Sequence, residues 1–472
     1  MRRRNRSFSL VRPQTYPLTR SSTDCRRDGL AIAQAGIGAA EPQKLVLRAL
    51  ESSSMPEDPL VVLAAGKAAV QMAIAAARWA GPRIRAGLIV ALEVGTGGPD
   101  DGARGDEAHG NDARGNDALA GFEAIAGGHP VPTESSERAG RRALELATSV
   151  SRDETLLVLL SGGASALMAV PASGLTLADK RATTQVLLRA GADIHALNTV
   201  RKHLSAIKGG WLAVRAGGRC RALVISDVVD NDLSVVASGP TVPDSSTFHD
   251  ALDVLQRFGG ESSYPAPVVA RLKQGNLSRT PPARIIEDTP KPGDPRLART
   301  TTAIIGSRLD AMTGASEEAE KRGYHVVTLP EPVVGEARVA ARSYLRDVLA
   351  AAKELPRPVC VVSSGETTVR VTGNGKGGRN QELALALVEP LAHFENDIVL
   401  VSVGTDGVDG PTDAAGAWVD NDTLSRALAN GVHPRDYLDE NNSYPFFNAC
   451  DGLIRTGPTG TNVGDLQVIL LA

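Results

Sequence analysis

Aromatic residues are scarce in this chain, and neither sign of charge dominates. Phe, Trp and Tyr make up 3% of the 472 residues, which leaves few side chains that could stack on nucleic-acid bases. The formal net charge is -3, so no general attraction draws the chain to nucleic acid or to an anionic membrane surface. We therefore expect neither nucleic acid nor a membrane among its partners.

Cysteines are equally few, and they lie far apart. The four are Cys25, Cys220, Cys360 and Cys450. They form no Cys-x-x-Cys pair and no Cys/His pattern with zinc-ligand spacing, which argues against a zinc site. Isolated cysteines are typical of reduced thiols in a cytosol-like compartment.

The N-terminal segment lacks acidic residues. Residues 1–23 carry six arginines and several Ser and Thr, a composition that mitochondrial transit peptides share. No apolar helical face accompanies these charges, so we favour a disordered tail over residues 1–28. A cytoplasmic location is the first expectation, and a mitochondrial one is the alternative.

Two stretches poor in apolar residues interrupt the chain. Residues 97–121 repeat Gly, Asp, Ala, Arg and Asn, which predicts a low-complexity surface insertion. Residues 274–299 are rich in Pro, Gly and charge, as linkers are. We place a domain boundary there, with an N-terminal domain at 29–285 and a C-terminal domain at 290–472. The length of 472 residues, at a prior of about 150 residues per domain, suggests two or three domains.

Continuous apolar runs alternate with helical patterns along both halves. The runs lie at 60–63, 88–92, 156–160, 223–225, 302–305, 325–327, 360–362, 398–401 and 468–471. Such runs are typical of strands buried on both faces of a parallel sheet. The alternation predicts an α/β protein with two α/β domains, without fixing the strand order.

One predicted helix carries a polar stripe beside its apolar one. It spans residues 196–208 and stops at Gly209-Gly210, a usual helix end. The stripe consists of Asn198, Arg201, Ser205 and Lys208. We interpret it as a solvated face.

Small polar and glycine residues follow two of the N-terminal runs. Lys67 follows Gly66 at a helix start, where the helix dipole opposes a cation unless an anion lies between. The run at 156–160 is followed by Ser161, Gly162, Gly163, Ala164 and Ser165. The backbone N–H groups and hydroxyls of this loop suit a phosphate, and a tight strand-to-helix turn is the alternative.

Two glycine-rich loops near the C-terminus carry opposite charges. Gly377 and Gly378 precede Arg379, whose planar guanidinium suits bidentate binding of phosphate or carboxylate. Asp406 and Asp409 lie in the second loop. They can hold Mg²⁺ on a nucleotide, because this ion uses one or two carboxylates together with phosphate oxygens. Turn formation by Asp-Gly pairs is the alternative.

The two loops suit chemistry on a phosphorylated substrate, at the edge of a sheet where α/β folds place ligands. Asp227 and Asp230, after the run at 223–225, are further candidates for an acid, a base or a metal ligand. Neither Gly66-Lys67 nor Gly375-Lys376 has Walker A spacing, so a phosphotransferase would belong to another class.

A nicotinamide-dependent dehydrogenase is the rival interpretation. Gly373, Gly375 and Gly378 have the spacing of the dinucleotide fingerprint, and a helical pattern follows them. Against this reading, the loop contains Lys376 and Arg379, and the next acidic strand end lies beyond the usual separation of about 20 residues.

Taken in order, the motifs resemble the ATP-dependent glycerate 2-kinases that carry a C-terminal MOFRL domain, some of which were formerly labelled hydroxypyruvate reductases. The resemblance covers about residues 29–472. It runs through Gly66-Lys67-Ala68, Gly128-His129-Pro130, Ser161-Gly162-Gly163, Asn198-Thr199-Val200-Arg201, Ser226-Asp227, Gly378-Arg379-Asn380 and Gly404-Thr405-Asp406.

The resemblance implies transfer of the γ-phosphoryl group of ATP to the 2-hydroxyl of D-glycerate. It implies a larger N-terminal Rossmann-like domain, a three-layer sandwich with a mostly parallel sheet, and catalytic roles for Lys67 and Arg379. The candidate nucleotide-binding residues are Ser161, Gly162, Gly163, Ser165, Gly377 and Gly378, and the candidate Mg²⁺ ligands are Asp406 and Asp409. An NAD(P)H-dependent hydroxypyruvate reductase stays as the alternative, and the sequence leaves a homodimer open.

Overall fold

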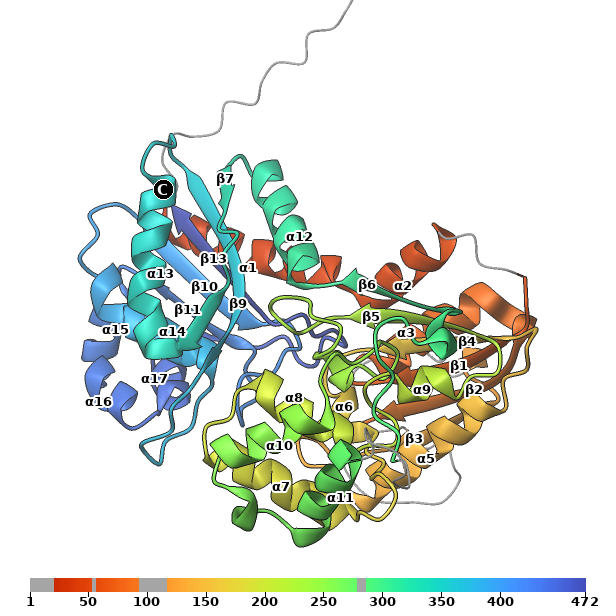
Figure 1. Ribbon diagram of the computed structural model, residues 1–472. Helices are drawn as coiled ribbons and strands as arrows, with labels where there is room; N and C mark the ends of the chain where they lie inside the picture. The colour runs from red at the N-terminus through yellow and green to blue at the C-terminus, as the bar shows by residue number, and fades with distance from the viewer. Residues whose placement is uncertain (1–20, 53–56, 93–116, 278–285) are drawn as a thin grey trace, which may run out of the picture.

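The chain forms two α/β domains side by side (Figure 1). The computed structural model describes residues 21–52, 57–92, 117–277 and 286–472. Residues 1–20 of the expected tail and 97–116 of the expected insertion lie outside this part. No helix within the described ranges is long and apolar enough to cross a lipid bilayer.

The first sheet is parallel and has the order β3-β2-β1-β4-β5-β6 within the described residues. Its strands are β1 (Leu60–Ala65), β2 (Ile84–Ala91), β3 (Phe122–Ala126), β4 (Thr155–Leu160), β5 (Arg219–Ile225) and β6 (Thr300–Gly306). The four apolar runs expected in the N-terminal domain form strands, and the run at 302–305, expected in the C-terminal domain, forms β6 of this sheet. Strand order reverses at β1, whose neighbours are β2 and β4, so the crevice beyond the ends of β1 and β4 is where a doubly wound sheet binds ligands.

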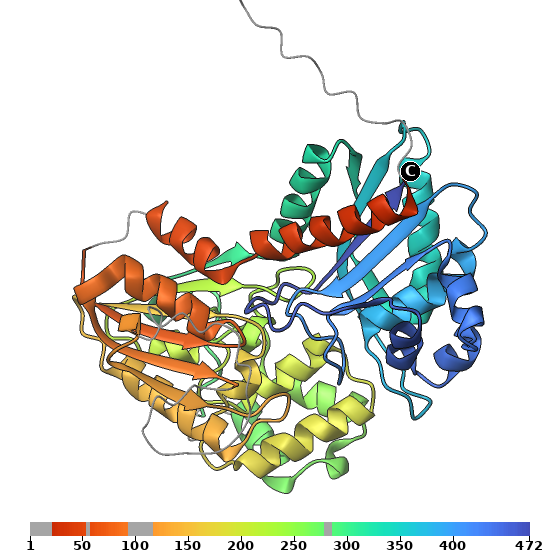
Figure 2. The ribbon, with the colours of Figure 1, turned by 180° about the vertical axis from the view of Figure 1, so that it is seen from behind.

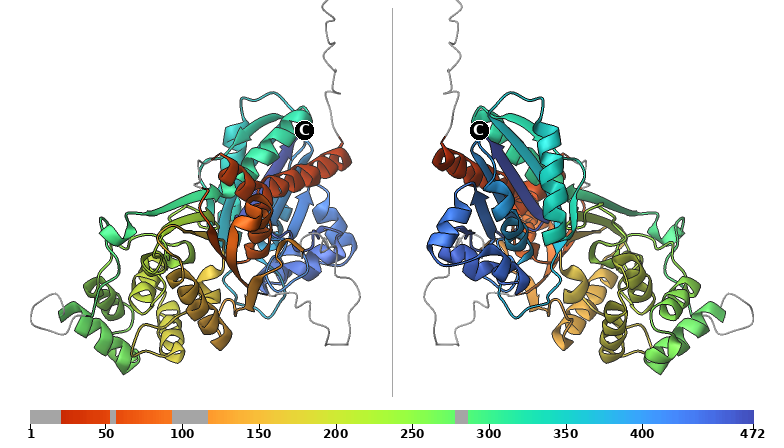
Figure 3. Two further views of the ribbon diagram at one scale, coloured as in Figure 1. Left: turned by 90° about the vertical axis from the view of Figure 1, so that its right-hand side faces the viewer. Right: turned by 90° about the vertical axis from the view of Figure 1, so that its left-hand side faces the viewer.

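Helices cover both faces of this sheet. One face carries α2 (Pro42–Glu51) and α3 (Ala69–Ala80), and the other carries α5 (Glu134–Thr148), α6 (Ala164–Leu167) and α9 (Trp211–Val214). The three-layer Rossmann-like sandwich is therefore confirmed. A lobe with a core of its own projects from it (Figure 3), formed by α7 (Leu177–Arg189), α8 (Ile194–His203), α10 (Phe248–Arg257) and α11 (Ala266–Leu277).

The helix predicted at 196–208 ends five residues early, because α8 stops at His203 and an irregular turn follows. Its polar stripe is not solvated, so that interpretation was wrong. Asn198, Ser205 and Lys208 are buried and Arg201 is partly buried, because the turn packs against Pro171 and α8 contacts the segment at 236–238.

The second sheet is mixed, with the order β12-β11-β10-β13-β9-β7 and with β8 beside β9. Its strands are β7 (His325–Thr328), β8 (Val333–Glu336), β9 (Val359–Thr368), β10 (Ile398–Gly404), β11 (Gly416–Asp420), β12 (Leu453–Ile454) and β13 (Asp465–Leu471). The apolar runs expected here are strands too, yet β9, β10 and β13 pair antiparallel. Burial on both faces produces a continuous apolar run whatever the strand direction.

Helices also cover both faces of the second sheet. One face carries α13 (Ala337–Ala352), α14 (Arg379–Leu391), α15 (Thr423–Ala429), α16 (Pro434–Asp439) and α17 (Ser443–Ala449). The other carries α12 (Arg308–Lys321) and α1 (Ser22–Ala39). Figure 2 shows α1, in red, lying across the strands of the second domain.

The two expected boundaries differ from the structure. Residues 22–28 belong to α1 rather than to a tail, and their helix packs on the C-terminal domain through Cys25, Ile32 and Ala33. At the other boundary, β6 pairs with β5, so the chain leaves the first sheet only after Gly306 and the division at 285–290 comes too early. The chain therefore passes between the domains twice, after α1 and after β6.

Candidate active site

A candidate site lies where strand ends of the two sheets meet. Lys67 follows β1 of the first domain, and Asp406 follows β10 of the second. The Lys67 Nζ and Asp406 Oδ2 atoms are 2.9 Å apart, with 29% and 18% of the two side chains exposed. The lysine that follows a strand of the first domain thus faces an aspartate from the acidic loop of the second domain.

The loops after β1 and β4 are joined by Ser161. Its buried hydroxyl accepts a hydrogen bond from the N–H of Ala68 at 3.0 Å, and the N–H of Lys67 donates to the Gly162 carbonyl at 2.9 Å. Gly66 has a φ of 126°, and a Cβ there would overlap Ser161. Ser161 therefore holds the loop of Lys67 in place. The sequence predicted a contact between Ser161 and a phosphate but did not predict this structural role.

Asp227 follows β5 and lies against the same loop. Its Oδ2 accepts a hydrogen bond of 3.3 Å from Asn462 Nδ2 of the second domain, and a Cβ on Gly162 would overlap this carboxylate. Burial raises the pKa of Asp227, the cations Lys67 and Arg379 oppose that rise, and Asp406 adds to it. Asp227 is thus a carboxylate of raised pKa within reach of charges from both domains.

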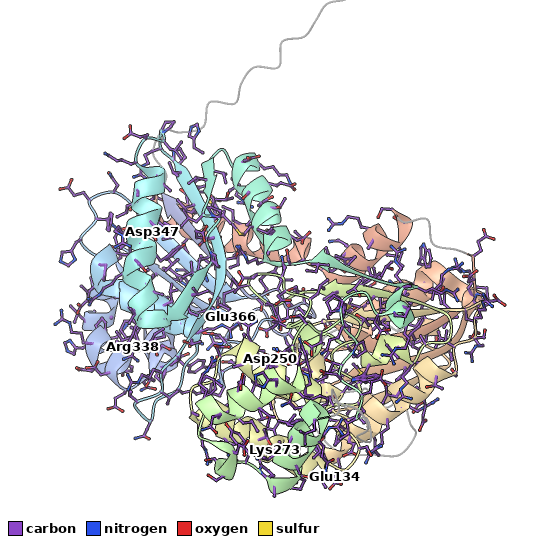
Figure 4. The ribbon with its side chains drawn as sticks, viewed as in Figure 1. Glu134, Asp250, Lys273, Arg338, Asp347 and Glu366 are labelled. Carbon is purple, nitrogen blue, oxygen red and sulfur yellow. The ribbon has the colours of Figure 1, made fainter. Side chains whose placement is uncertain are left out.

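Arg379 begins α14 as the sequence predicts, and two carboxylates hold it. Its Nε donates to Asp465 Oδ2 at 2.7 Å, and its Nη1 lies 3.7 Å from Glu366 Oε1. Burial opposes the charge, but Asp465 and Glu366 together raise the pKa of Arg379. Burial raises the pKa of Glu366, which lies on the side of the second domain that faces the first (Figure 4).

Lys67 and Arg379 act on the same acidic groups. Both cations oppose the rise in pKa of Asp227, and both oppose that of Glu366. The two predicted catalytic side chains therefore share one region between the domains rather than facing separate surfaces.

Asp409 has a different environment from Asp406. It is 2% exposed, and its two carboxylate oxygens accept hydrogen bonds from the N–H groups of Asn380 and Gln381 and from Gln381 Nε2, at 2.9 to 3.1 Å. Burial raises its pKa to about 6, against the lowering by those donors. Asp409 thus fills the anion-binding position at the start of α14, and a role as metal ligand does not fit this environment.

The surroundings of Gly377 and Gly378 differ from those expected of nucleotide-binding residues. A Cβ on Gly378 would overlap Asp409, and one on Gly377 would overlap Ser443. These glycines allow the basic loop to pack against its neighbours. The N–H groups of the helix start behind them are already used by Asp409.

Gly163 and Ser165 line a cleft of about 500 Å³ together with His129, Asp227 and Glu366. Gly163 begins α6. The Ser165 hydroxyl contacts Arg201 Nη2 and Lys208 Nζ, each at 2.7 Å, and Ser238 Oγ at 2.9 Å. The predicted phosphate ligand Ser165 is therefore bound to two cations of the N-terminal domain.

The roles of Asp465 and Glu366 at the site, and the contact of Arg201 with Ser165, were not predicted from the sequence. A signal for Asp465 existed, because it is an acidic residue that opens a long apolar strand directly after a glycine. Glu366 likewise follows Gly365 near the end of β9. An acidic residue at the end of a buried strand needs a cationic partner, which Arg379 supplies to both.

Comparison with known proteins agrees with this architecture. A family model described as a domain of unknown function, DUF4147, matches residues 28–273, and the MOFRL family model matches residues 359–465. These two matches define the class of protein: an N-terminal DUF4147 domain followed by a MOFRL domain.

Curated relatives narrow the class. The D-glycerate 2-kinase of Thermotoga maritima is 38% identical over 446 residues, which cover 94% of this chain and 97% of that protein. The glycerate 2-kinase of Pyrococcus horikoshii is 33% identical, with 95% and 98% covered. The chain therefore belongs to the glycerate 2-kinase family with a C-terminal MOFRL domain, as its motifs predict.

Solved structures give the same relationship. The crystal structure of the Thermotoga maritima glycerate kinase has a TM-score of 0.79 at 37% identity and covers 95% of this chain and all of that one. A Pyrococcus horikoshii structure has a TM-score of 0.73 at 32% identity, with 95% and 98% covered. One relative, from Agrobacterium vitis, is 36% identical over 99% of each chain and bears the name putative hydroxypyruvate reductase.

Proposed function

We propose that this protein transfers the γ-phosphoryl group of ATP to the 2-hydroxyl of D-glycerate, giving 2-phosphoglycerate and ADP. The observation that carries the proposal is the pairing of Lys67 with Asp406 across the two domains, beside Asp227 and Arg379. Family membership supplies the substrate, since the relatives named above are glycerate kinases.

Each residue has a role in this reaction. Asp227 accepts the proton of the substrate hydroxyl, and its raised pKa suits it to hold that proton. The hydroxyl oxygen forms the new bond to phosphorus, while the bond to the ADP oxygen breaks and its electron pair leaves with ADP. Lys67 and Arg379 neutralise negative charge on the transferring group, because phosphoryl transfer depends mostly on positioning and charge.

The surroundings of Lys67 fit a nucleotide that carries Mg²⁺. Asp227, Glu366, Asp406 and Asp465 gather there around two cations, and the pKa values of Asp227 and Glu366 are raised. An excess of carboxylates suits a bound divalent cation. Within the described ranges, no group of three or more His, Cys, Asp or Glu side chains is placed to hold a metal ion, so the ion would depend on phosphate oxygens for its other ligands. Asp406 would hold the ion, which would neutralise the phosphate oxygens when bound.

The dehydrogenase interpretation has less support. A dinucleotide fingerprint requires a strand, a glycine turn and a helix in succession. Here β9 ends at Thr368, and in the irregular segment that follows Gly373 and Gly375 pack against residues 440–442 while Gly378 packs against Asp409. That segment does not leave a strand end open for a pyrophosphate.

The deciding experiment incubates the protein with MgATP and D-glycerate and separates 2-phosphoglycerate from 3-phosphoglycerate. NADH with hydroxypyruvate is assayed in parallel, with and without Mg²⁺. Formation of 2-phosphoglycerate supports the proposal, whereas oxidation of NADH without phosphoryl transfer would replace it. A cytoplasmic location and a homodimer stay predictions, which fractionation and sedimentation measure.

A further inference from the structure

One end of the cleft holds two cations without an acidic partner. Arg201 lines the cleft, and Lys208 lies behind Ser165 with 2% of its surface exposed. Within the part of the chain that the structure describes, neither forms an ion pair, although Asp230 and Asp232 line the same cleft. Burial lowers the pKa of Arg201 to about 10 and that of Lys208 well below its usual range. A buried ammonium beside a partly buried guanidinium calls for an anion.

The same place presents an unused hydrogen-bond donor. Asn198 is 3% exposed and lines the cleft, and its Nδ2 has no hydrogen-bond partner among the described residues. An orphaned buried donor is costly unless a ligand completes it.

The cations determine which way this amide points. Arg201 and Lys208 both donate to the Ser165 hydroxyl, so Ser165 must donate its own proton to Ser238 Oγ. Ser238 then donates to Asn198 Oδ1 at 2.9 Å. This chain of donors directs the Asn198 oxygen to Ser238 and leaves its NH₂ group free.

The cleft thus has ends of opposite character. Asp227 and Glu366 line it on the side of Lys67 and Arg379, where carboxylates are in excess. Arg201 and Asn198 offer only donors. A ligand that spans the cleft would place a negative group at the donor end and a neutral hydroxyl toward Asp227.

We propose that Arg201 and Asn198 bind the carboxylate of a small 2-hydroxy acid and so select an anionic substrate over an uncharged polyol. Lys208 and Ser165 position Arg201 and keep the Asn198 amide oriented. This inference rests on the proposed function, which supplies the acid. The inference adds the residues that recognise the negative charge of the acid, and these residues are different from those that contact the phosphate groups.

The test measures binding of D-glycerate, glycerol and inorganic phosphate by calorimetry, without nucleotide, together with KM values for D-glycerate and MgATP. Arg201→Gln should weaken D-glycerate binding about 10- to 100-fold, and Asn198→Ala about 10-fold, with the KM for MgATP within about twofold of the original. Arg271→Gln is the matched control, because Arg271 donates to the carbonyls of His203 and Ser173 in the same lobe and does not line the cleft.

An unchanged affinity for D-glycerate in both variants would overturn the inference. So would a rise in the KM for MgATP alone, or a stronger loss for phosphate than for D-glycerate, which would assign the cations to a phosphoryl group. If Arg201→Gln does not fold, Asn198→Ala decides alone. A protein that binds D-glycerate through Arg201 but transfers no phosphoryl group would refute the proposed function and keep this site. Turnover of D-glycerate by the protein, together with unchanged D-glycerate binding in both variants, would support the proposed function and refute this site.

Discussion

The Lys67 ammonium lies 2.9 Å from the Asp406 carboxylate, although the two residues are 339 positions apart in the chain. The contact joins the switch point of the first sheet to the acidic loop of the second domain. Because both side chains are partly exposed, the pair contributes only about 1 kcal/mol or less to stability. Its geometry therefore has more bearing on the chemistry between the domains than on folding.

Lys67→Ala should remove most of the activity and little of the stability. We expect kcat to fall about 100-fold or more, by analogy with the loss of one preorganised donor to a developing negative charge. Steady-state kinetics and the thermal unfolding midpoint are the measurements. Lys44→Ala is the matched control, since Lys44 forms an exposed pair with Glu41. Near-normal turnover in Lys67→Ala would remove this residue from the mechanism.

The pH dependence of kcat/KM should report Asp227. A base must be ionised to accept a proton, so activity should fall as the pH drops through the pKa of Asp227. Because burial raises that pKa, the acidic limb should lie above the value of about 3.9 of an unperturbed aspartate. Asp227→Asn should abolish activity at every pH, while Asp230→Asn keeps the limb. A profile flat down to pH 4 would contradict this role.

Asp406 and Asp409 should separate into a functional and a structural carboxylate. Asp406→Asn should raise the Mg²⁺ concentration needed for half-maximal turnover. Asp409→Ala should instead lower the free energy of unfolding by about 1–2 kcal/mol, because the start of α14 loses its acceptor. Titration of activity with Mg²⁺ and denaturant unfolding distinguish the two. A shifted Mg²⁺ requirement in Asp409→Ala alone would reverse the assignment.

Arg379→Lys tests whether the guanidinium shape matters beyond its charge. Arg379 uses Nε for Asp465 and Nη1 toward Glu366, and a lysine ammonium cannot reproduce this fork. We expect kcat to fall about 10-fold or more, with a small loss in thermal stability because Asp465 keeps the hydrogen bond from Asn380 Nδ2. Activity equal to that of the unaltered protein would show that charge alone suffices.

The strands were predictable from the sequence because burial on both faces leaves a continuous apolar run. Runs such as that at 156–160, which lies in β4, form the strands expected of them. The direction of the strands in the second sheet was not predictable, since the same apolar pattern accompanies β10 and β13, which pair antiparallel. The pattern of apolar residues indicates which faces of a strand are buried. It does not indicate which strand lies beside it or in which direction that strand runs.

Part of the site was predictable for a similar reason. Lys67 and Asp406 follow buried strands, and the ends of such strands meet in a crevice. By contrast, Asp409 and Asp406 look alike in the sequence, and only tertiary packing gives Asp409 to the amides of α14. Likewise, Asn198 lies on a helix whose pattern suggests solvent, and its burial depends on the segment at 236–238, far along the chain.

The place of α1 has a practical consequence for dissecting this protein. Gly36 of α1 packs so closely on Leu466 and Ala311 that a side chain there would overlap both. A fragment that begins after β6 would keep α12 but would leave the part of the sheet that α1 covers bare to water, which favours aggregation. Expressing that half alone would require grafting the first helix onto it, or supplying the helix as a separate peptide.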